Sequence, residues 1–203
     1  MAYDFSSRAS SHPWIDSVWS FAFLDNGIYR ATPDGCWRLF QLLTPGCEPR
    51  VVIVGQRAVR VDVPHLAGER VLAIAIAGHV HIAGETEPPT GSEVRFMPVH
   101  GGEFEIKGLR LPLPTFDTAE DIIERMASHH VLRSNLIVER ALNDAANGMP
   151  KRTLQHHFKR TTGIGPKDFR QIRRAQEAVR RLKSGGSGAD VAAELAMPII
   201  SRT

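Results

Sequence analysis

An amphipathic segment at residues 151–162 limits the folds open to this sequence, and it follows a run of small residues ending in Gly148. Helical periodicity places Leu154 and Phe158 together on one side of the segment. The opposite side carries Arg152, Gln155, His156 and Lys159. Asn147 and Gly148 readily adopt the positive φ that ends a helix and turns the chain. The sequence therefore predicts a helix, a tight turn and a second helix with one buried and one polar face.

The polar face of the segment combines guanidinium, amide, imidazole and ammonium groups. In the major groove of DNA, arginine reads guanine and glutamine reads adenine, so this face suits a helix-turn-helix placed on DNA. The same pattern fits an ordinary amphipathic helix whose basic face is solvated. Periodicity alone leaves both interpretations open.

Three spaced motifs extend this segment: Arg-Thr-Leu-Gln-x-x-Phe at 152–158, Gly-x-x-Pro-Lys at 163–167 and Arg-Arg-Ala at 173–175. Between about residues 134 and 195, they resemble the first DNA-binding half of an AraC/XylS-type transcription regulator. The resemblance implies that the helix at 151–162 reads the major groove of double-stranded DNA. The residues expected to contact base edges are Arg152, Gln155 and His156. Those expected to bind phosphates are Lys151, Lys159, Arg160 and Lys167.

The sequence departs from the family pattern at two positions. Pro150 stands where the family usually has a serine that caps the helix, and the lost side-chain cap should cost about 1 kcal/mol. His156 replaces a more usual arginine, so we expect its contact with DNA to be weaker and pH-dependent. Both departures concern the predicted recognition helix itself.

Pro166 is expected to begin a long helix. Its predicted buried stripe comprises Phe169, Ile172, Ala175, Val179 and Leu182. In the resembled family this helix connects two helix-turn-helix units, and residues 187–195 resemble the first helix of the second unit. Pro198 then opposes helix continuation before the sequence reaches Thr203, so we expect the second unit to be truncated. This expectation leaves open a weak DNA binder, or an interaction or decoy module without specific DNA binding.

The charge of the chain is unevenly distributed, although the net charge of the whole sequence is only +3. Residues 1–128 contain 11 Lys and Arg against 16 Asp and Glu, a net charge of −5. Residues 129–203 contain 14 against 6, a net charge of +8. A concentrated positive segment binds polyphosphate through counterion release, whereas an acidic segment has no such attraction. The asymmetry therefore favours DNA contact by the C-terminal segment.

The chain up to about Pro112 has the pattern of a β-rich domain. Short apolar and β-branched runs occur at 14–23, 37–43, 50–54, 58–63, 71–76 and 103–106. Glycine and proline separate these runs, and Asp25, Asn26 and Gly27 predict a hairpin after the first one. We therefore expect a small barrel or sandwich, which together with the helical part gives an α+β chain.

The predicted domain organisation has three parts. Residues 1–112 form a sensor-like domain, 113–130 a linker and coupling helix, and 131–203 the helix-turn-helix domain. Alternating prolines keep the linker extended, and a capping-box pattern at 117–120 predicts that a helix begins there. A further helix is expected from about residue 132 to 146. These helices either couple the sensor to the DNA-binding part or carry a homodimer contact.

The β-rich part also resembles the sensor-like region of one branch of AraC-type regulators, through Pro-Asp-Gly-Cys at 33–36 and Val-Ile-Val-Gly at 52–55. The resemblance implies a small-molecule effector in this part. A cluster of aromatic residues comprises Trp14, Trp19, Phe21, Phe23 and Trp37. These side chains either line an effector pocket or fill the core.

His79, His81 and Glu85 form the one group with the chemistry of a metal site. Residues two apart in a strand face the same side, and His-x-His-x-x-x-Glu resembles part of the first cupin metal motif. The flanking glycines do not keep the cupin spacing, and His100 is the only nearby candidate for a further ligand. We therefore predict no bound metal or other cofactor, with a cupin-like metal-binding enzyme or metal sensor as the alternative.

No other feature of the sequence indicates an enzyme or a membrane protein. We find no catalytic triad, phosphate-binding loop or paired-carboxylate motif, so we expect a protein that is not an enzyme. Two cysteines, Cys36 and Cys47, are too few for a disulfide framework or a thiolate zinc site. The sequence has no long apolar run and no secretion signal at its start, so we expect a cytoplasmic protein without a membrane partner.

Overall fold

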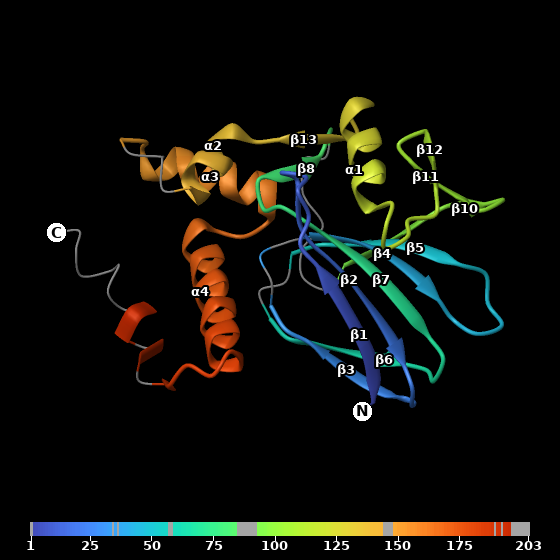
Figure 1. Ribbon diagram of the computed structural model, residues 1–203. Coiled ribbons are helices and arrows are strands. Elements are labelled where there is room, and N and C mark those ends of the chain that lie inside the picture. Colours follow the sequence, from blue (N-terminus) through green and yellow to red (C-terminus); the bar gives the residue numbers. More distant parts are fainter. Residues whose placement is uncertain are drawn as a thin grey trace.

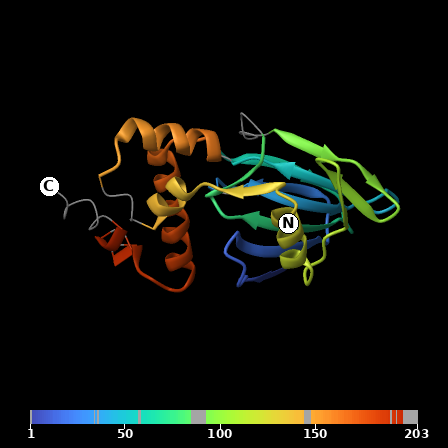
Figure 2. The same cartoon turned by 90° about the horizontal axis from the view of Figure 1, so that it is seen from above.

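The computed structural model of the chain describes residues 2–33, 35, 37–56, 59–84, 93–143, 148–188, 190, 191 and 193–195. Strands dominate the N-terminal part and helices the C-terminal part (Figure 1), which confirms the predicted α+β fold. The described strands form open sheets, none of which closes into a barrel, so the predicted barrel is too specific. Seen from above in Figure 2, the C-terminal helices lie beside the β-rich part.

The largest sheet has six antiparallel strands. Its order is β1 (Tyr3–Arg8), β2 (Ile15–Phe23), β7 (Arg70–Ile76), β4 (Trp37–Leu43), β5 (Arg50–Val54) and β9 (Val94–Met97). Val18 and Leu39 both lie opposite Ile74, and all three are at most 1% exposed, so they share one buried face. The strands predicted at 37–43 and 50–54 coincide with β4 and β5. Runs of β-branched and aromatic residues thus located these strands correctly.

The buried face of this sheet is covered by α1 (Ala119–Ser128) and a three-stranded sheet. The three strands are β10 (Val99–His100), β11 (Glu103–Ile106) and β12 (Leu109–Pro112). The buried residues of α1 are Ala119, Ile122, Ile123 and Met126. Their helical spacing gives α1 one apolar side, which packs in the main hydrophobic core.

α1 begins where the sequence predicts it, but a different interaction fixes it. Thr118, at the N-cap position, forms no side-chain cap, and its Oγ1 instead accepts a hydrogen bond from Thr115 N at 3.0 Å. Arg8 of β1 donates two hydrogen bonds of 2.6 Å to the carboxylate of Glu120. Ser10 Oγ donates a third at 2.6 Å, so a charged network holds the first turn of α1 against the edge of the sheet.

The opposite face of the six-stranded sheet is partly covered by β3 (Gly27–Ala31) and β6 (Val61–His65). Tyr29 and His65 pack against Phe23, and the His65 ring stacks on the Phe23 ring at 3.8 Å between centroids. The predicted hairpin is wrong because β3 pairs with β6, whereas β2 pairs with β1 and β7. The chain turns after β2 as expected, but β3 then crosses the six-stranded sheet and covers aromatic side chains of that sheet.

The predicted aromatic cluster is divided between the two faces of this sheet. Trp14 and Trp37 pack with the core under α1, where Trp37 Nε1 donates a hydrogen bond to Val80 O at 2.8 Å. Trp19, Phe21 and Phe23 lie on the other face and contact one another. The five side chains therefore do not line one common pocket.

A short antiparallel strand pair joins the β-rich part to the helices. β8 (Val80–Ile82) pairs with β13 (Leu132–Ser134), and Leu132 is 1% exposed. The helix predicted across this region is wrong at its start, because α2 (Leu136–Leu142) begins only after Asn135. A strand of three residues that pairs with a segment distant in sequence leaves no periodic pattern to read.

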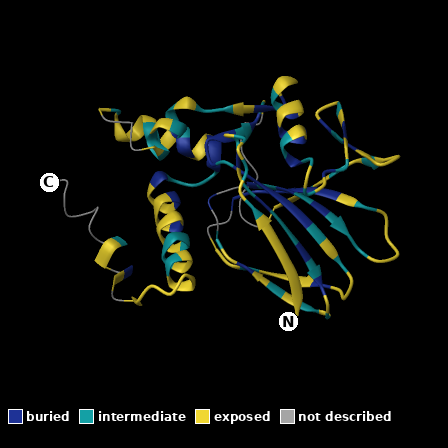
Figure 3. Ribbon diagram, viewed as in Figure 1, coloured by how far each residue is buried: buried dark blue, intermediate teal, exposed yellow. Residues whose placement is uncertain are grey.

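The last two long helices are α3 (Lys151–Thr162) and α4 (Pro166–Lys183). The apolar stripe of α4 is buried only at its start: Phe169 and Ile172 are buried as predicted, but Ala175, Val179 and Leu182 are exposed. Figure 3 shows this change along α4. Gly188 and residues 193–195 are helical, while the end of the predicted second unit, 196–203, lies outside the described residues. Of the helices that the structure describes, none has the length and apolar character needed to span a membrane.

Candidate DNA-binding interface

Asn135 fixes the start of α2 and its position against α3. Its Oδ1 accepts hydrogen bonds from the backbone N–H groups of Ile137 and Val138 at 3.1 and 3.4 Å. Its Nδ2 donates a hydrogen bond to Thr161 Oγ1 at 2.8 Å and lies 3.2 Å from His157 Nδ1. One side chain therefore caps α2 and connects it to the last turns of α3.

Two glycines bend the chain before and after α3. Gly148 has a φ of 82° and Gly163 a φ of 76°, a region that other residues rarely adopt. Pro150 occupies the N-cap position of α3 and supplies no side-chain cap, in line with the sequence analysis. Pro166 then begins α4 at its first helical position. α2, α3 and α4 are thus separate helices rather than one continuous rod.

The inner side of α3 packs in a second, smaller hydrophobic core. Phe158 is 2% exposed, and its ring meets that of Phe169 from α4 edge to face at 5.7 Å between centroids. Val138 of α2 is the third buried member. Leu154 packs partly buried against this set, so both residues predicted to face inward lie on the packed side of α3.

The outer side of α3 presents the residues expected to bind DNA. Arg152, Gln155 and His156 are exposed. The phosphate-binding candidates Lys151, Lys159, Arg160 and Lys167 are also exposed. Within the described part of the chain, none of the charged members of this set forms a salt bridge. Their charges are therefore available to an anionic ligand.

A family model described as a helix-turn-helix domain matches residues 145–197, a range that includes α3 and α4. The C-terminal part of this chain is an AraC-type helix-turn-helix domain. Comparisons with curated proteins and with solved structures gave no significant match. The match supports DNA binding and transcription regulation as the general function of the chain.

The AraC-type domain packs against the β-rich part through Phe169. A Cβ atom on Gly78 would lie 2.6 Å from Phe169 Cζ, and one on Gly35 would lie 3.0 Å from Cε2. Carbon atoms in van der Waals contact are about 3.5–4.0 Å apart, so Gly78 in particular has no room for a side chain. Because Phe169 also belongs to the core between the helices, the β-rich part touches that core directly.

Two further residues of α4 continue this contact. Arg173 Nη1 donates a hydrogen bond to Asp16 Oδ1 at 3.1 Å, and Gln176 Nε2 donates one to Pro33 O at 3.4 Å. Phe169, Arg173 and Gln176 are spaced by four and then three residues, so their side chains lie along one side of α4. That side faces the β-rich part, although Arg173 lies outside the buried stripe that the sequence predicts.

The two histidines of the proposed metal site lie in different settings. His79 is in a turn before β8, so the assumption that both residues share one strand is wrong. Burial lowers the pKa of His79, opposed by the charge of Glu139. Burial also lowers the pKa of His81, and the positive charges of Arg133 and Arg160 lower it further.

These surroundings give no support to a metal site. Glu85, the third predicted ligand, lies outside the described residues. Among the residues that the structure does describe, no three histidine, cysteine, aspartate or glutamate side chains gather closely enough to hold a metal ion. The two guanidinium groups near His81 also disfavour a bound cation.

The residues that orient α3 were not predicted from the sequence. Asn135 stands directly before an apolar run, and this N-cap signal could have located the start of α2. The contact of Phe169 with Gly35 and Gly78 has no comparable signal, because it joins segments that are distant in sequence.

Proposed function

We propose that this protein is a sequence-specific transcription regulator that inserts α3 into the major groove of double-stranded DNA. The observation that carries the proposal is the two-sided character of α3. Phe158 and Thr161 are 2% exposed on its inner side, while Arg152 and Gln155 are exposed on its outer side. In a helix-turn-helix the second helix enters the groove, and here that helix is α3.

Each side chain of the outer face has a role in this proposal. Arg152 donates to guanine O6 and N7, and Gln155 pairs with adenine N6 and N7. His156 is the third base contact. The groups that hold α3 in register on the phosphates are Lys151, Lys159, Arg160 and Lys167. The net charge of +8 in residues 129–203 strengthens these phosphate contacts.

The β-rich part has a regulatory role in the same proposal. Residues 1–112 form the sensor, 113–130 the coupling segment with α1, and 131–203 the DNA-binding part. The packing of α1 in the β-rich core, and of Phe169 against Gly78, supports coupling between these parts. A homodimer would place two copies of α3 on half-sites about one helical turn apart.

The salt dependence of DNA binding tests the proposal. Fluorescence anisotropy would follow the full chain binding to a labelled duplex of random sequence over a series of salt concentrations. We expect the affinity to fall steeply with salt, and Lys159→Ala to reduce the log–log slope by about 1, since one phosphate contact is lost.

The matched control for Lys159→Ala is Arg110→Ala, which removes an exposed cation from β12 in the β-rich part. We expect this variant to keep the slope of the unmodified protein. Absence of binding at low salt, or equal slopes for the two variants, would contradict the placement of α3 on DNA.

A further inference from the structure

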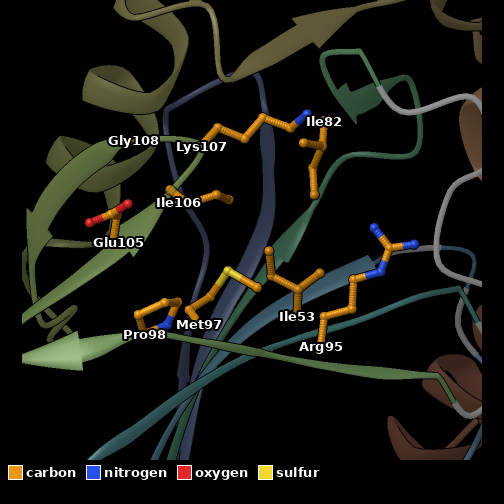
Figure 4. Close-up of a pocket in the computed structure, with 9 residues that line it drawn as sticks. All are labelled: Ile53, Ile82, Arg95, Met97, Pro98, Glu105, Ile106, Lys107 and Gly108. Carbon is orange, nitrogen blue, oxygen red and sulfur yellow. The ribbon is translucent and has the colours of Figure 1, made fainter.

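A pocket of about 310 Å³ opens at the edge of the β-rich core. Its lining comes from β5, β8, β9 and the β11–β12 hairpin (Figure 4). The apolar lining residues are Ile53, Ile82, Met97, Pro98 and Ile106. The volume lies at the lower end of the range of about 300–1,000 Å³ that small-molecule sites occupy. The pocket therefore suits a small ligand with an apolar body.

Two cationic side chains, those of Lys107 and Arg95, lie at the margin of this apolar surface. Lys107 extends along the pocket toward the end of β8. Its Nζ lies 3.6 Å from the position that a Cβ atom on Gly84 would take. Figure 4 shows the ammonium group near Ile82. Among the residues that the structure describes, Lys107 has no carboxylate partner. Arg95 lines the pocket from β9 and donates a hydrogen bond to Glu93 at 2.8 Å. Lys107 is thus the cation best placed to bind an incoming anion.

The acidic member of the lining does not offset this charge. Glu105 lies 3.7 Å from Arg110 across the hairpin, so a neighbouring cation balances its carboxylate. Figure 4 shows the Glu105 carboxylate on the opposite side of the pocket from the Lys107 ammonium. The pocket therefore combines an apolar interior with positive charge at one end.

The backbone at Lys107 is unusual for a lysine. Lys107 and Gly108 have φ values of 50° and 78° in the two-residue turn between β11 and β12. Such turns favour asparagine followed by glycine, because a lysine in the left-handed region is less favourable. The turn thus places the ammonium group of Lys107 at the pocket through a backbone conformation that lysine rarely adopts.

We propose that this pocket binds a small organic monocarboxylate with an apolar chain or ring. Ile53, Ile82 and Ile106 would contact the apolar part, and Lys107 would bind the carboxylate in a charge-assisted hydrogen bond. A neutral ligand of the same shape would leave the ammonium unpaired, and a cationic one would be repelled.

The position of the pocket also gives the ligand a route to the DNA-binding part. Ile82 lies opposite Leu132 in the β8–β13 pair, and β8 contacts α3. A ligand that shifts β8 therefore acts on the strand that precedes α2 and on the recognition helix. This regulatory role rests on the proposed function, whereas the binding site itself does not.

Octanoate, 1-octanol and octylamine are the probes that test the site. Isothermal titration calorimetry of the full chain at neutral pH would compare their affinities, and methyl NMR would locate the bound ligand. We expect octanoate to bind most tightly and to shift the methyl signals of Ile53, Ile82, Met97 and Ile106. Equal affinity for the three probes, or octanoate shifts confined to other methyl groups, would overturn the proposal.

Lys107→Asn separates loss of charge from loss of folding. Asparagine suits the turn better than lysine, so this variant should melt at the same temperature as the unmodified protein or higher. Lys107 is exposed, so solvent screens its charge, and we expect the octanoate affinity to fall about fivefold. The control Arg70→Asn removes an exposed cation from β7, outside the pocket, and should change the affinity less than twofold. An equal loss in both variants would show a general charge effect and refute the assigned role of Lys107.

DNA anisotropy with and without octanoate tests the regulatory role. A change in DNA affinity that Lys107→Asn abolishes would support it, and octanoate binding with unchanged DNA affinity would refute it. If octanoate shifts the methyl signals of these four residues but the protein binds no DNA, the proposed function fails while the binding site stands.

Discussion

Replacing Gly78 with alanine should destabilise the packing of the AraC-type domain on the β-rich part. The new Cβ atom would lie 2.6 Å from Phe169 Cζ and 2.8 Å from Cε2, about 1 Å closer than carbon atoms normally approach. Overpacking of this kind costs about 1–3 kcal/mol. Gly78 does not have a positive φ, so alanine fits its backbone and regains about 0.4–1 kcal/mol through the unfolded state. We therefore expect Gly78→Ala to lower the free energy of unfolding by about 1–2 kcal/mol.

Urea unfolding of the full chain measures this loss, with circular dichroism and tryptophan fluorescence as separate probes. The three tryptophans lie in the β-rich part, whereas circular dichroism at helical wavelengths weights the helices. The control is Gly188→Ala, since a Cβ atom on Gly188 would meet no atom within 4 Å. We expect the control to be neutral or slightly stabilising.

A double-mutant cycle with Phe169→Leu assigns the effect to this contact. The shorter leucine makes room for the new methyl group, so Gly78→Ala should cost about 1 kcal/mol less in that background. If Gly78→Ala is as stable as Gly188→Ala, or if the cycle shows no coupling, the reasoning about this contact is refuted.

Two other predictions concern the residues that fix α1 and α2. The Arg8 guanidinium lowers the pKa of Glu120 from 4.5 to about 2, so Glu120 contributes stability that is complete above pH 4.5 and lost as the pH falls toward 2. Glu120→Gln should lower the free energy of unfolding by about 2 kcal/mol at neutral pH and weaken its dependence on pH below 4.5, both measured by urea unfolding. Glu124→Gln, at an exposed position, should change neither quantity. Asn135→Ala loses the α2 cap and the bond to Thr161, so thermal unfolding should show a loss of about 2 kcal/mol together with weaker DNA binding. A DNA affinity unchanged by Asn135→Ala would contradict its role in orienting α3.

Local patterns predicted much of the fold. The sequence located β4, β5 and α3 because β-branched runs and a regular apolar spacing encode them within a few residues. It also placed Leu154 and Phe158 on the packed side of α3, and Arg152 and Gln155 on the exposed side. Side-chain periodicity is thus sufficient to orient a short helix that has one apolar face.

Contacts between distant segments were not predictable in this way. β13 is a strand only because β8 offers it an edge, and β3 leaves β2 because it pairs with β6. Apolar residues continue at helical spacing along α4 to Val179 and Leu182, yet in the described structure only those at the start of the helix are buried. Periodicity shows which residues share a face, but not whether another segment packs against that face.

Base reading by the outer face of α3 is the property on which the proposed function depends. Selection of bound duplexes from a random DNA library, followed by sequencing, tests it most directly when the unmodified protein is compared with Gln155→Ala and Lys159→Ala. We predict an enriched motif for the unmodified protein, loss of preference at one adenine position with Gln155→Ala, and the same motif at lower affinity with Lys159→Ala. An enriched motif that is identical in all three proteins, or no enrichment in any of them, would contradict base reading by α3.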